Sequence, residues 1–153
     1  MEIQIVESPQ SMNLVRELFV EYATSLHIDL YLYGFGQELD TLPGNYTPPS
    51  GRLLLAIEDG EIAGCIALRK LNETDCEMKR LYVRAKFRGC GIGKKLTEAI
   101  ISEAKGIGYT RMFLDTFINM KAAVGLHKSL GFKITEPYYY NPLEGAIFMV
   151  LDL

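Results

Sequence analysis

The residues most informative about chemistry form a glycine-rich segment between a predicted strand and a predicted helix. The segment reads Arg88-Gly89-Cys90-Gly91-Ile92-Gly93-Lys94. Glycine at every second position lets several backbone N–H groups point at one ligand without obstruction by side chains. The helix that follows adds unpaired N–H groups and the positive end of its dipole, and the flanking cations add full charges. The segment therefore predicts a phosphate-binding loop, best suited to a diphosphate.

Two well-known phosphate-binding loops fit this segment poorly. A P-loop needs glycine at position 88 and Ser or Thr after Lys94, where this chain has Arg88 and Lys95. A dinucleotide fingerprint needs glycine in place of Lys94, and residues 84–87 separate the predicted strand from the glycines, whereas the dinucleotide turn is tight. Asp115 does lie about 22 residues further on, where a ribose-binding acid belongs. The dinucleotide interpretation is disfavoured, and ligand binding can test it.

The elements that must position this loop follow from the hydrophobic pattern. Ser8 and Pro9 are typical of an N-cap and a first helical residue, and the turn at 58–61 is typical of a hairpin. Strands are predicted at 3–6, 53–57, 62–68, 77–83, 111–116, 132–134 and 146–151, and helices at 9–26, 37–42, 92–107 and 119–130. This order predicts an α/β (α+β) fold with a mixed, mostly antiparallel central sheet of about six to seven strands flanked by about four helices, in a single domain over 1–153.

Composition excludes several classes of function. The chain has 153 residues, 48% of them hydrophobic, which suits one compact domain with its own core. A net charge of −3 gives no bulk attraction to nucleic acid. The three cysteines form no metal-ligand spacing and there are only two histidines, so no metal is expected, and an odd, small cysteine count fits a reducing compartment. No run reaches membrane-spanning length and no leader is recognisable, so we expect a soluble, cytoplasmic protein.

Three segments in order resemble the GCN5-related N-acetyltransferase (GNAT) family. The run Arg88-x-x-Gly91-x-Gly93 resembles the family's acetyl-CoA signature, Arg/Gln-x-x-Gly-x-Gly/Ala. The run at 77–83 is similar to the family's strand before this loop, and the run at 126–132 is similar to its late helix ending in Gly-Phe. The resemblance covers most of the chain. It implies an acyl-CoA N-acyltransferase-like fold, acetyl-CoA as co-substrate and an amine as acceptor.

The same resemblance implies where acetyl-CoA would bind. Backbone amides of the loop would hold the pyrophosphate, and the pantetheine arm would pair like an extra strand with the strand before the loop. A bulge near 79–81 would have to splay the sheet to admit this arm. The donor-binding residues expected on this basis are Leu81, Val83, Arg88, Gly89, Gly91, Ile92, Gly93, Lys94 and Asn119.

Candidates for proton transfer also come from the resemblance. Glu77 occupies the position of the general base in several family members, although a carboxyl of ordinary pKa near 4.3 needs burial or a water relay to serve. The alternative is a carboxylate paired with Lys79 or Arg80. His127 stands where the family usually has a tyrosine as general acid, and its helical spacing equally fits a packed, structural histidine. Further candidate proton donors are Tyr82 and the run Tyr138-Tyr139-Tyr140, although three consecutive tyrosines more often line a pocket or an interface.

The acceptor site is expected in the segment at 27–49, which closes over the acceptor in this family. Residues 17–51 contain five acids and no Lys or Arg, which favours a small cationic amine or an amino acid. The expected acceptor-binding residues are Asp29, Tyr31, Glu38 and Tyr139. We expect direct transfer to a small-molecule or peptide amine in a ternary complex, with a homodimer left open. The alternative is an acetyl-CoA-binding sensor or complex subunit without catalysis.

Overall fold

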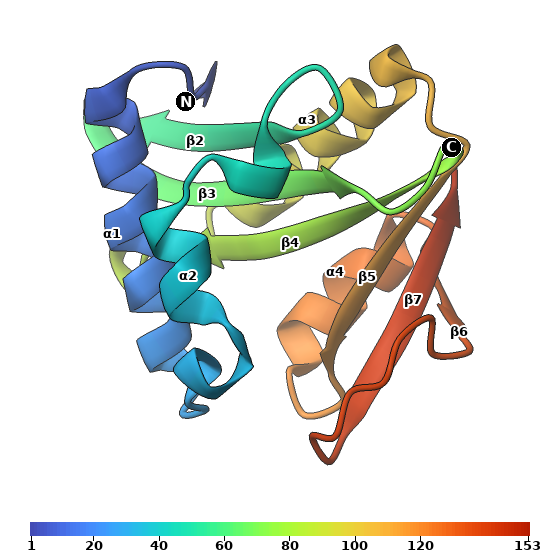
Figure 1. Ribbon diagram of the computed structural model, residues 1–153. Helices are drawn as coiled ribbons and strands as arrows, with labels where there is room; N and C mark the ends of the chain where they lie inside the picture. Colours follow the sequence, from blue (N-terminus) through green and yellow to red (C-terminus); the bar gives the residue numbers. More distant parts are fainter.

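The computed structural model describes residues 1–153 and shows a seven-stranded sheet with helices on both faces (Figure 1). The strands are β1 (Glu2–Ile5), β2 (Arg52–Glu58), β3 (Glu61–Lys70), β4 (Asp75–Val83), β5 (Arg111–Phe117), β6 (Lys133–Thr135) and β7 (Ala146–Asp152). The helices are α1 (Pro9–Ser25), α2 (Phe35–Asp40), α3 (Ile92–Ile107) and α4 (Lys121–Ser129), with short 3-10 helices η1 (Leu30–Tyr33), η2 (Gly44–Tyr46) and η3 (Ala85–Phe87). None of the helices has the length and apolar character to cross a membrane.

The strand order is β1-β2-β3-β4-β5-β7-β6, and only the β4–β5 pair is parallel. The predicted mixed, mostly antiparallel sheet flanked by four helices is therefore confirmed. Boundaries moved by a few residues. The helix predicted at 37–42 lies at Phe35–Asp40, and the helix predicted at 119–130 begins only at Lys121. Such shifts at element ends are usual, because capping geometry rather than hydrophobic spacing decides them.

Two hydrophobic cores hold the helices on opposite faces of the sheet. Helix α1 begins at Pro9, where the Ser8 hydroxyl accepts the Ser11 N–H at 3.1 Å. Its buried stripe, with Leu18 and Phe19 at its centre, packs with α2 on one face of β2 and β3. Helix α3 packs on the other face through Leu96, Ile100 and Ala104. Because successive strand residues alternate between faces, both layers are held by the same two central strands.

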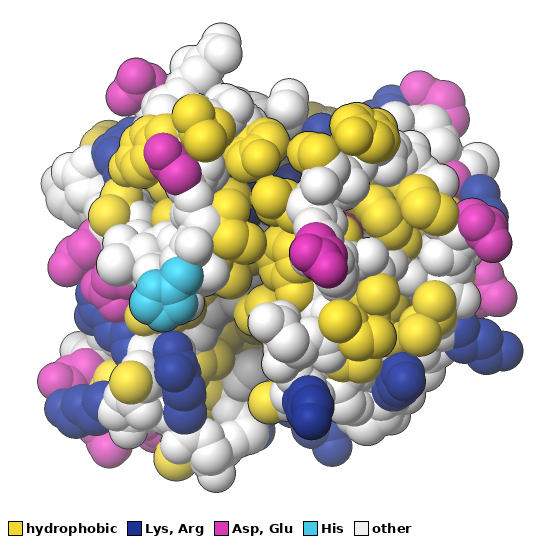
Figure 2. Space-filling model, turned by 90° about the horizontal axis from the view of Figure 1, so that it is seen from below, with side chains coloured by type: hydrophobic (Ala, Val, Ile, Leu, Met, Phe, Trp, Pro, Cys, Tyr) yellow, Lys and Arg dark blue, Asp and Glu magenta, His cyan; other side chains and the backbone are white.

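The sheet opens in its middle, between β4 and β5. These strands pair only where Asp75–Glu77 lies beside Arg111–Phe113, and from there they diverge (Figure 1). Strand β5 keeps its other partner, β7, as far as Phe117. The rest of β4 therefore has an edge without a strand partner on its β5 side. We call this opening the β4–β5 split. Figure 2 views its open end and shows hydrophobic side chains gathered around a hollow in that face.

A bulge in β4 accompanies the split. Lys79 faces Ala67 and Tyr82 faces Cys65, so two residues of β4 lie opposite the single Ile66 of β3. One of the two is Arg80, whose φ of 61° lies in the left-handed region that a bulky residue rarely adopts. The bulge expected near 79–81 is thus present.

Candidate active site

The glycine-rich loop leads directly into α3. Gly89 and Gly91 have φ values of 82° and 80°, and a Cβ added to either would meet no other part of the chain within 4 Å. No side chain caps the helix, and the Lys95 N–H makes a helical hydrogen bond with the Gly91 carbonyl at 3.1 Å. The N–H groups ahead of Lys95 therefore have no helical partner and lie at an exposed helix N-terminus. This arrangement suits an anion with several oxygens.

The edge of β4 that faces the split offers peptide groups to a ligand. The Arg84 N–H donates to the Ala63 carbonyl of β3 at 2.8 Å. Because peptide groups alternate along a strand, those of Leu81 and Val83 face away from β3, toward the split. Arg88 donates from Nε to the Val83 carbonyl at 2.9 Å, which leaves Leu81 as the freer of the two expected pairing positions.

A small cavity lies inside the split, with a volume of about 60 Å³. It is lined by Tyr22, Met78, Lys79, Arg80, Leu81, Leu114, Asp115, Thr116, Met120, Ala123 and His127. The side chain of His127 is 3% exposed and its Nδ1 has no hydrogen-bond partner. Burial lowers the pKa of His127 to about 4, so the ring is neutral at neutral pH. The ring therefore lines the split as a neutral group rather than as a charge.

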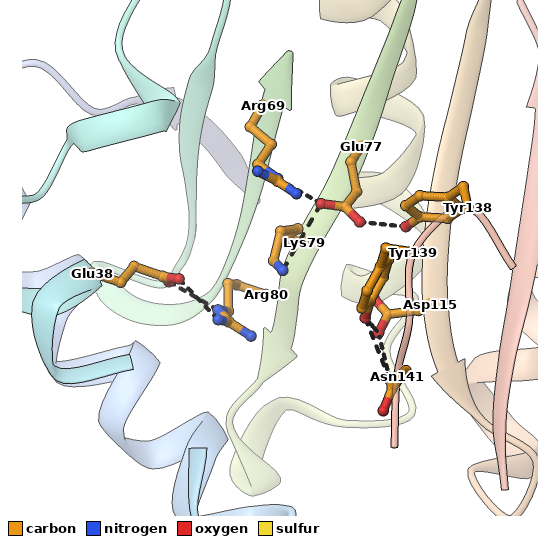
Figure 3. Close-up of polar contacts among 9 residues, drawn as sticks. All are labelled: Glu38, Arg69, Glu77, Lys79, Arg80, Asp115, Tyr138, Tyr139 and Asn141. Carbon is orange, nitrogen blue, oxygen red and sulfur yellow. Dashed lines mark hydrogen bonds and ion pairs between the residues drawn. The ribbon is translucent and has the colours of Figure 1, made fainter. Parts of the chain in front are cut away.

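Glu77 lies at the point where β4 and β5 separate, and it is completely buried (Figure 3). Arg69 Nε donates to Glu77 Oε1 at 2.6 Å, and the Tyr138 hydroxyl donates to Oε2. Lys79 Nζ lies 3.8 Å from Oε1, so the ion pair between Glu77 and Lys79 that was considered as the alternative role of Glu77 is present, though without a hydrogen bond. Arg80 pairs elsewhere, with Glu38. Glu77 lines neither cavity, so contact with an acceptor amine requires an intervening group or water.

A second, larger cavity of about 460 Å³ lies between α2, η2, the C-terminal end of β3 and the middle of β4. We call it the α2 cavity. It is lined by Gly34, Gln37, Glu38, Thr41, Pro43, Gly44, Asn45, Tyr46, Arg69 and Lys79. The segment expected to close over the acceptor thus does form a cavity beside the split. Lys79 is the one residue that lines both cavities.

The structure places the expected acceptor residues apart. Glu38 lines the α2 cavity, whereas Asp29 caps η1 by accepting the Tyr31 N–H at 3.0 Å. Tyr31 is 56% exposed and packs against the Phe35 ring. Tyr139 lies near the split on the other side, where its hydroxyl donates to Asp115.

Two further expected residues lie outside both cavities. The Tyr82 hydroxyl lies 3.4 Å from Glu21 Oε1, on the α1 side of β4. Asn119 is exposed in the turn between β5 and α4. Their assigned roles in proton donation and donor binding stay predictions.

Two polar residues at the site, Arg69 and Lys79, were not predicted as site residues, and Tyr138 was considered only as one of three consecutive tyrosines that could donate a proton. Lys79 was considered only as an ion-pair partner of Glu77. Arg69 and Tyr138 reach Glu77 across 8 and 61 residues of sequence, and no local pattern reveals such contacts.

Comparisons with known proteins agree with this geometry. The model of the acetyltransferase (GNAT) family matches residues 13–132. An N-acetyltransferase of Schizosaccharomyces pombe is 39% identical over 153 residues, covering 99% of this chain and 94% of the relative. An acetyltransferase structure from Streptococcus agalactiae superposes with a TM-score of 0.81 at 22% identity, covering 99% of this chain and 98% of the other. One from Salmonella typhimurium, determined with its cofactor acetyl-CoA, gives 0.70 at 22% identity, covering 99% and 93%.

The chain therefore belongs to the GNAT acetyltransferase family. Its sheet and helices form an acyl-CoA N-acyltransferase-like fold, and the β4–β5 split opens within this sheet. The enzyme class expected from the three sequence segments is confirmed.

Proposed function

We propose that this acetyltransferase moves the acetyl group of acetyl-CoA directly to the primary amine of a small molecule, amino acid or peptide in a ternary complex. The observation that carries the proposal is the position of the β4–β5 split. It lies between the loop of free N–H groups at the start of α3 and the α2 cavity. One opening can therefore bring a phosphate-bearing donor and an acceptor together.

The residues present fit acetyl-CoA. The N–H groups of Gly89, Gly91 and Gly93 would hold the pyrophosphate, each hydrogen bond to a charged group contributing about 1.5–3 kcal/mol. The free peptide group of Leu81 would pair with the amides of the pantetheine arm. The His127 side chain lines the cavity in the split, where the arm would end. Acetyl-CoA supplies the activated acyl group, and the protein supplies alignment.

The acceptor must lose a proton before it reacts. A lysine-like amine with a pKa near 10.4 is neutral in about one part in a few thousand at pH 7, a penalty of about 4.6 kcal/mol. An α-amino group near 7.8 is neutral in about one part in seven. The cationic Lys79 at the junction of the cavities would lower the pKa of an amine placed beside it. We assign the released proton to Glu77, reached through water because its carboxylate lines neither cavity.

The cysteines support direct transfer over a covalent acyl-enzyme. Cys65 and Cys76 are buried, and burial raises the pKa of both thiols, that of Cys76 to about 12. Cys90 is exposed but lies in the loop that would hold the pyrophosphate. In the proposed step, the amine nitrogen attacks the thioester carbonyl and the C–S bond breaks. The departing thiolate, with a pKa near 8.5, needs only a weak proton donor.

The test is to incubate the purified protein with acetyl-CoA and a panel of amines, and to follow the release of free thiol. We expect thiol release that depends on an amine and is lost in the Gly91→Asp variant. Binding of CoA without thiol release for every amine would contradict the proposal and favour the sensor alternative. Stabilisation against heat by NAD but not by CoA would favour the dinucleotide interpretation.

A further inference from the structure

In the wall of the α2 cavity, the one carboxylate already has hydrogen-bond partners, whereas the two cations still have free N–H donors. The three charged residues lining the cavity are Glu38, Arg69 and Lys79. Both oxygens of Glu38 are already occupied, because Arg80 donates from Nε to Oε2 and from a terminal nitrogen to Oε1, each at 2.9 Å. The only carboxylate in the wall therefore has its charge compensated from outside the cavity.

The two cations in the wall keep unused donors. Arg69 makes one hydrogen bond, from Nε to Glu77, so its terminal nitrogens have none. Lys79 Nζ makes no hydrogen bond, and its nearest carboxylate oxygen is that of Glu77, 3.8 Å away. A single carboxylate, Glu77, thus faces two cations, and it is completely buried and does not line the cavity.

No carboxylate on the split side of Lys79 provides the hydrogen-bond acceptor that its ammonium group lacks. Asp115 of β5 lines the split cavity and not the α2 cavity. Its Oδ2 accepts hydrogen bonds from Tyr139 and Asn141 (Figure 3). Burial lowers the pKa of Lys79, although Glu77 and Asp115 oppose the change, so the ammonium is poorly compensated. An incoming anion would relieve this cost.

We propose that Arg69 and Lys79 bind a carboxylate of the acceptor, so that the natural acceptor is an amine bearing a carboxylate close to its amino group, as in an amino acid. This inference rests on the proposed function and narrows its acceptor class. Gln37, Thr41 and Asn45 supply further polar groups to the same wall. The volume of about 460 Å³ lies in the range of small-molecule sites, about 300–1,000 Å³.

The position of Lys79 explains why the carboxylate must lie near the amine. Lys79 lines both the α2 cavity and the split cavity. A carboxylate held on Nζ from the α2 side leaves the neighbouring carbon atoms at the junction, where an amine on them faces the split. An amine separated from its carboxylate by a long chain would not reach both positions.

The test compares matched ligands that differ only in this charge. N-acetylated amino acids and their C-terminal amides are titrated by calorimetry into the protein in the presence of CoA, so that binding is measured without turnover. We expect the carboxylates to bind at least about 10-fold more tightly than the amides, the effect of losing one charge-assisted hydrogen bond. Equal affinities, or no binding of either ligand, would overturn the proposal.

Variants of Lys79 test whether this residue causes the preference for carboxylates. Lys79→Met should bring the carboxylate and amide affinities together, whereas Lys79→Arg should keep a preference. The matched control is Lys70→Met, which removes an exposed lysine paired with Glu73 at 2.7 Å and should leave the preference unchanged. Thiol release measured in parallel separates the two claims. A protein that binds the carboxylates selectively but acetylates no amine would contradict the proposed function alone, and one that acetylates amides as well as acids would contradict this inference alone.

Discussion

Arg80 binds Glu38 through two hydrogen bonds of 2.9 Å, and this pair joins the bulge of β4 to helix α2. The side chains are only 13% and 23% exposed. The guanidinium also lies over the Tyr22 and Phe35 rings, with its central carbon 5.8 and 5.4 Å from their centroids. The wall between the split and the α2 cavity therefore depends on a contact between segments 42 residues apart.

Removing this ion pair should destabilise the protein. Glu38→Gln leaves the Arg80 guanidinium in place without its carboxylate, and we expect the free energy of unfolding to fall by about 1.5–3 kcal/mol. Urea denaturation measures the change. Glu73→Gln, which removes a pair with Lys70 on the surface, should leave the urea midpoint unaltered. Equal midpoints for both variants would show that the Arg80 pair is not important for stability.

The bulge can be tested from the opposite strand. A Cβ on Gly64 would lie 2.4 Å from the carbonyl oxygen of Tyr82, so Gly64→Ala forces the β4 backbone to move. We expect a loss of about 1–3 kcal/mol of stability together with weaker acetyl-CoA binding. Gly106→Ala is the matched control, because that helical glycine has open space around it and alanine favours a helix. Its thermal midpoint should rise. A Gly64→Ala protein as stable as wild type would contradict the described packing.

The sequence predicted the local features of this molecule well. The α1 cap at Ser8, the helix after the glycine loop and the β4 bulge each depend on neighbouring residues or on a family pattern that spans one element. The acceptor side was predicted less completely. Of the four residues expected there, only Glu38 lines the α2 cavity.

The reason is that the proposed acceptor side is built from non-local contacts. Glu77 meets Tyr138 across 61 residues, and Arg80 meets Glu38 across 42. Charge counted along the segment at 17–51 favoured a cationic acceptor. In the structure, cations from β3 and β4 enter the same cavity, and Arg80 occupies the one acid that reaches it.

An acidic side chain in the glycine loop should leave the protein folded but abolish CoA binding. Gly91→Asp places a carboxylate against the proposed pyrophosphate position, so CoA should no longer raise the melting temperature. Aspartate is also strained at the φ of 80° found there. Gly60→Asp controls for that strain, because Gly60 has a φ of 78° in the β2–β3 turn, also with open space around it. CoA should still stabilise this control. An unchanged response of the Gly91 variant would refute the loop assignment.

His127 should make stability depend on pH. Burial lowers the pKa of His127 from 6.5 to about 4 in the folded protein, so the unfolded chain takes up a proton first as the pH falls. Its contribution is fully present above pH 6.5 and is lost toward pH 4, up to about 3 kcal/mol. His127→Phe should lack this loss in urea denaturation across that range, while the exposed His27→Gln should retain it. A pH profile identical to wild type in His127→Phe would contradict the described burial.

The same variant separates the two roles considered for His127. Acetyl-CoA affinity and turnover are measured at one neutral pH. Full activity in His127→Phe would make the ring a packing residue against Phe132, whose centroid lies 5.7 Å away. Reduced turnover with unchanged acetyl-CoA affinity would assign the imidazole ring a role in the transfer step.

The central claim is that acetyl-CoA lies along the open edge of β4 with its phosphates on the loop before α3. Hydrogen exchange of single amides, followed by NMR with and without saturating acetyl-CoA, tests it most directly. Exchange should slow at the Leu81, Gly91 and Gly93 N–H groups, and change little at Arg84, which already donates to Ala63 at 2.8 Å. Unaltered exchange at Leu81 and at both glycines would contradict the account.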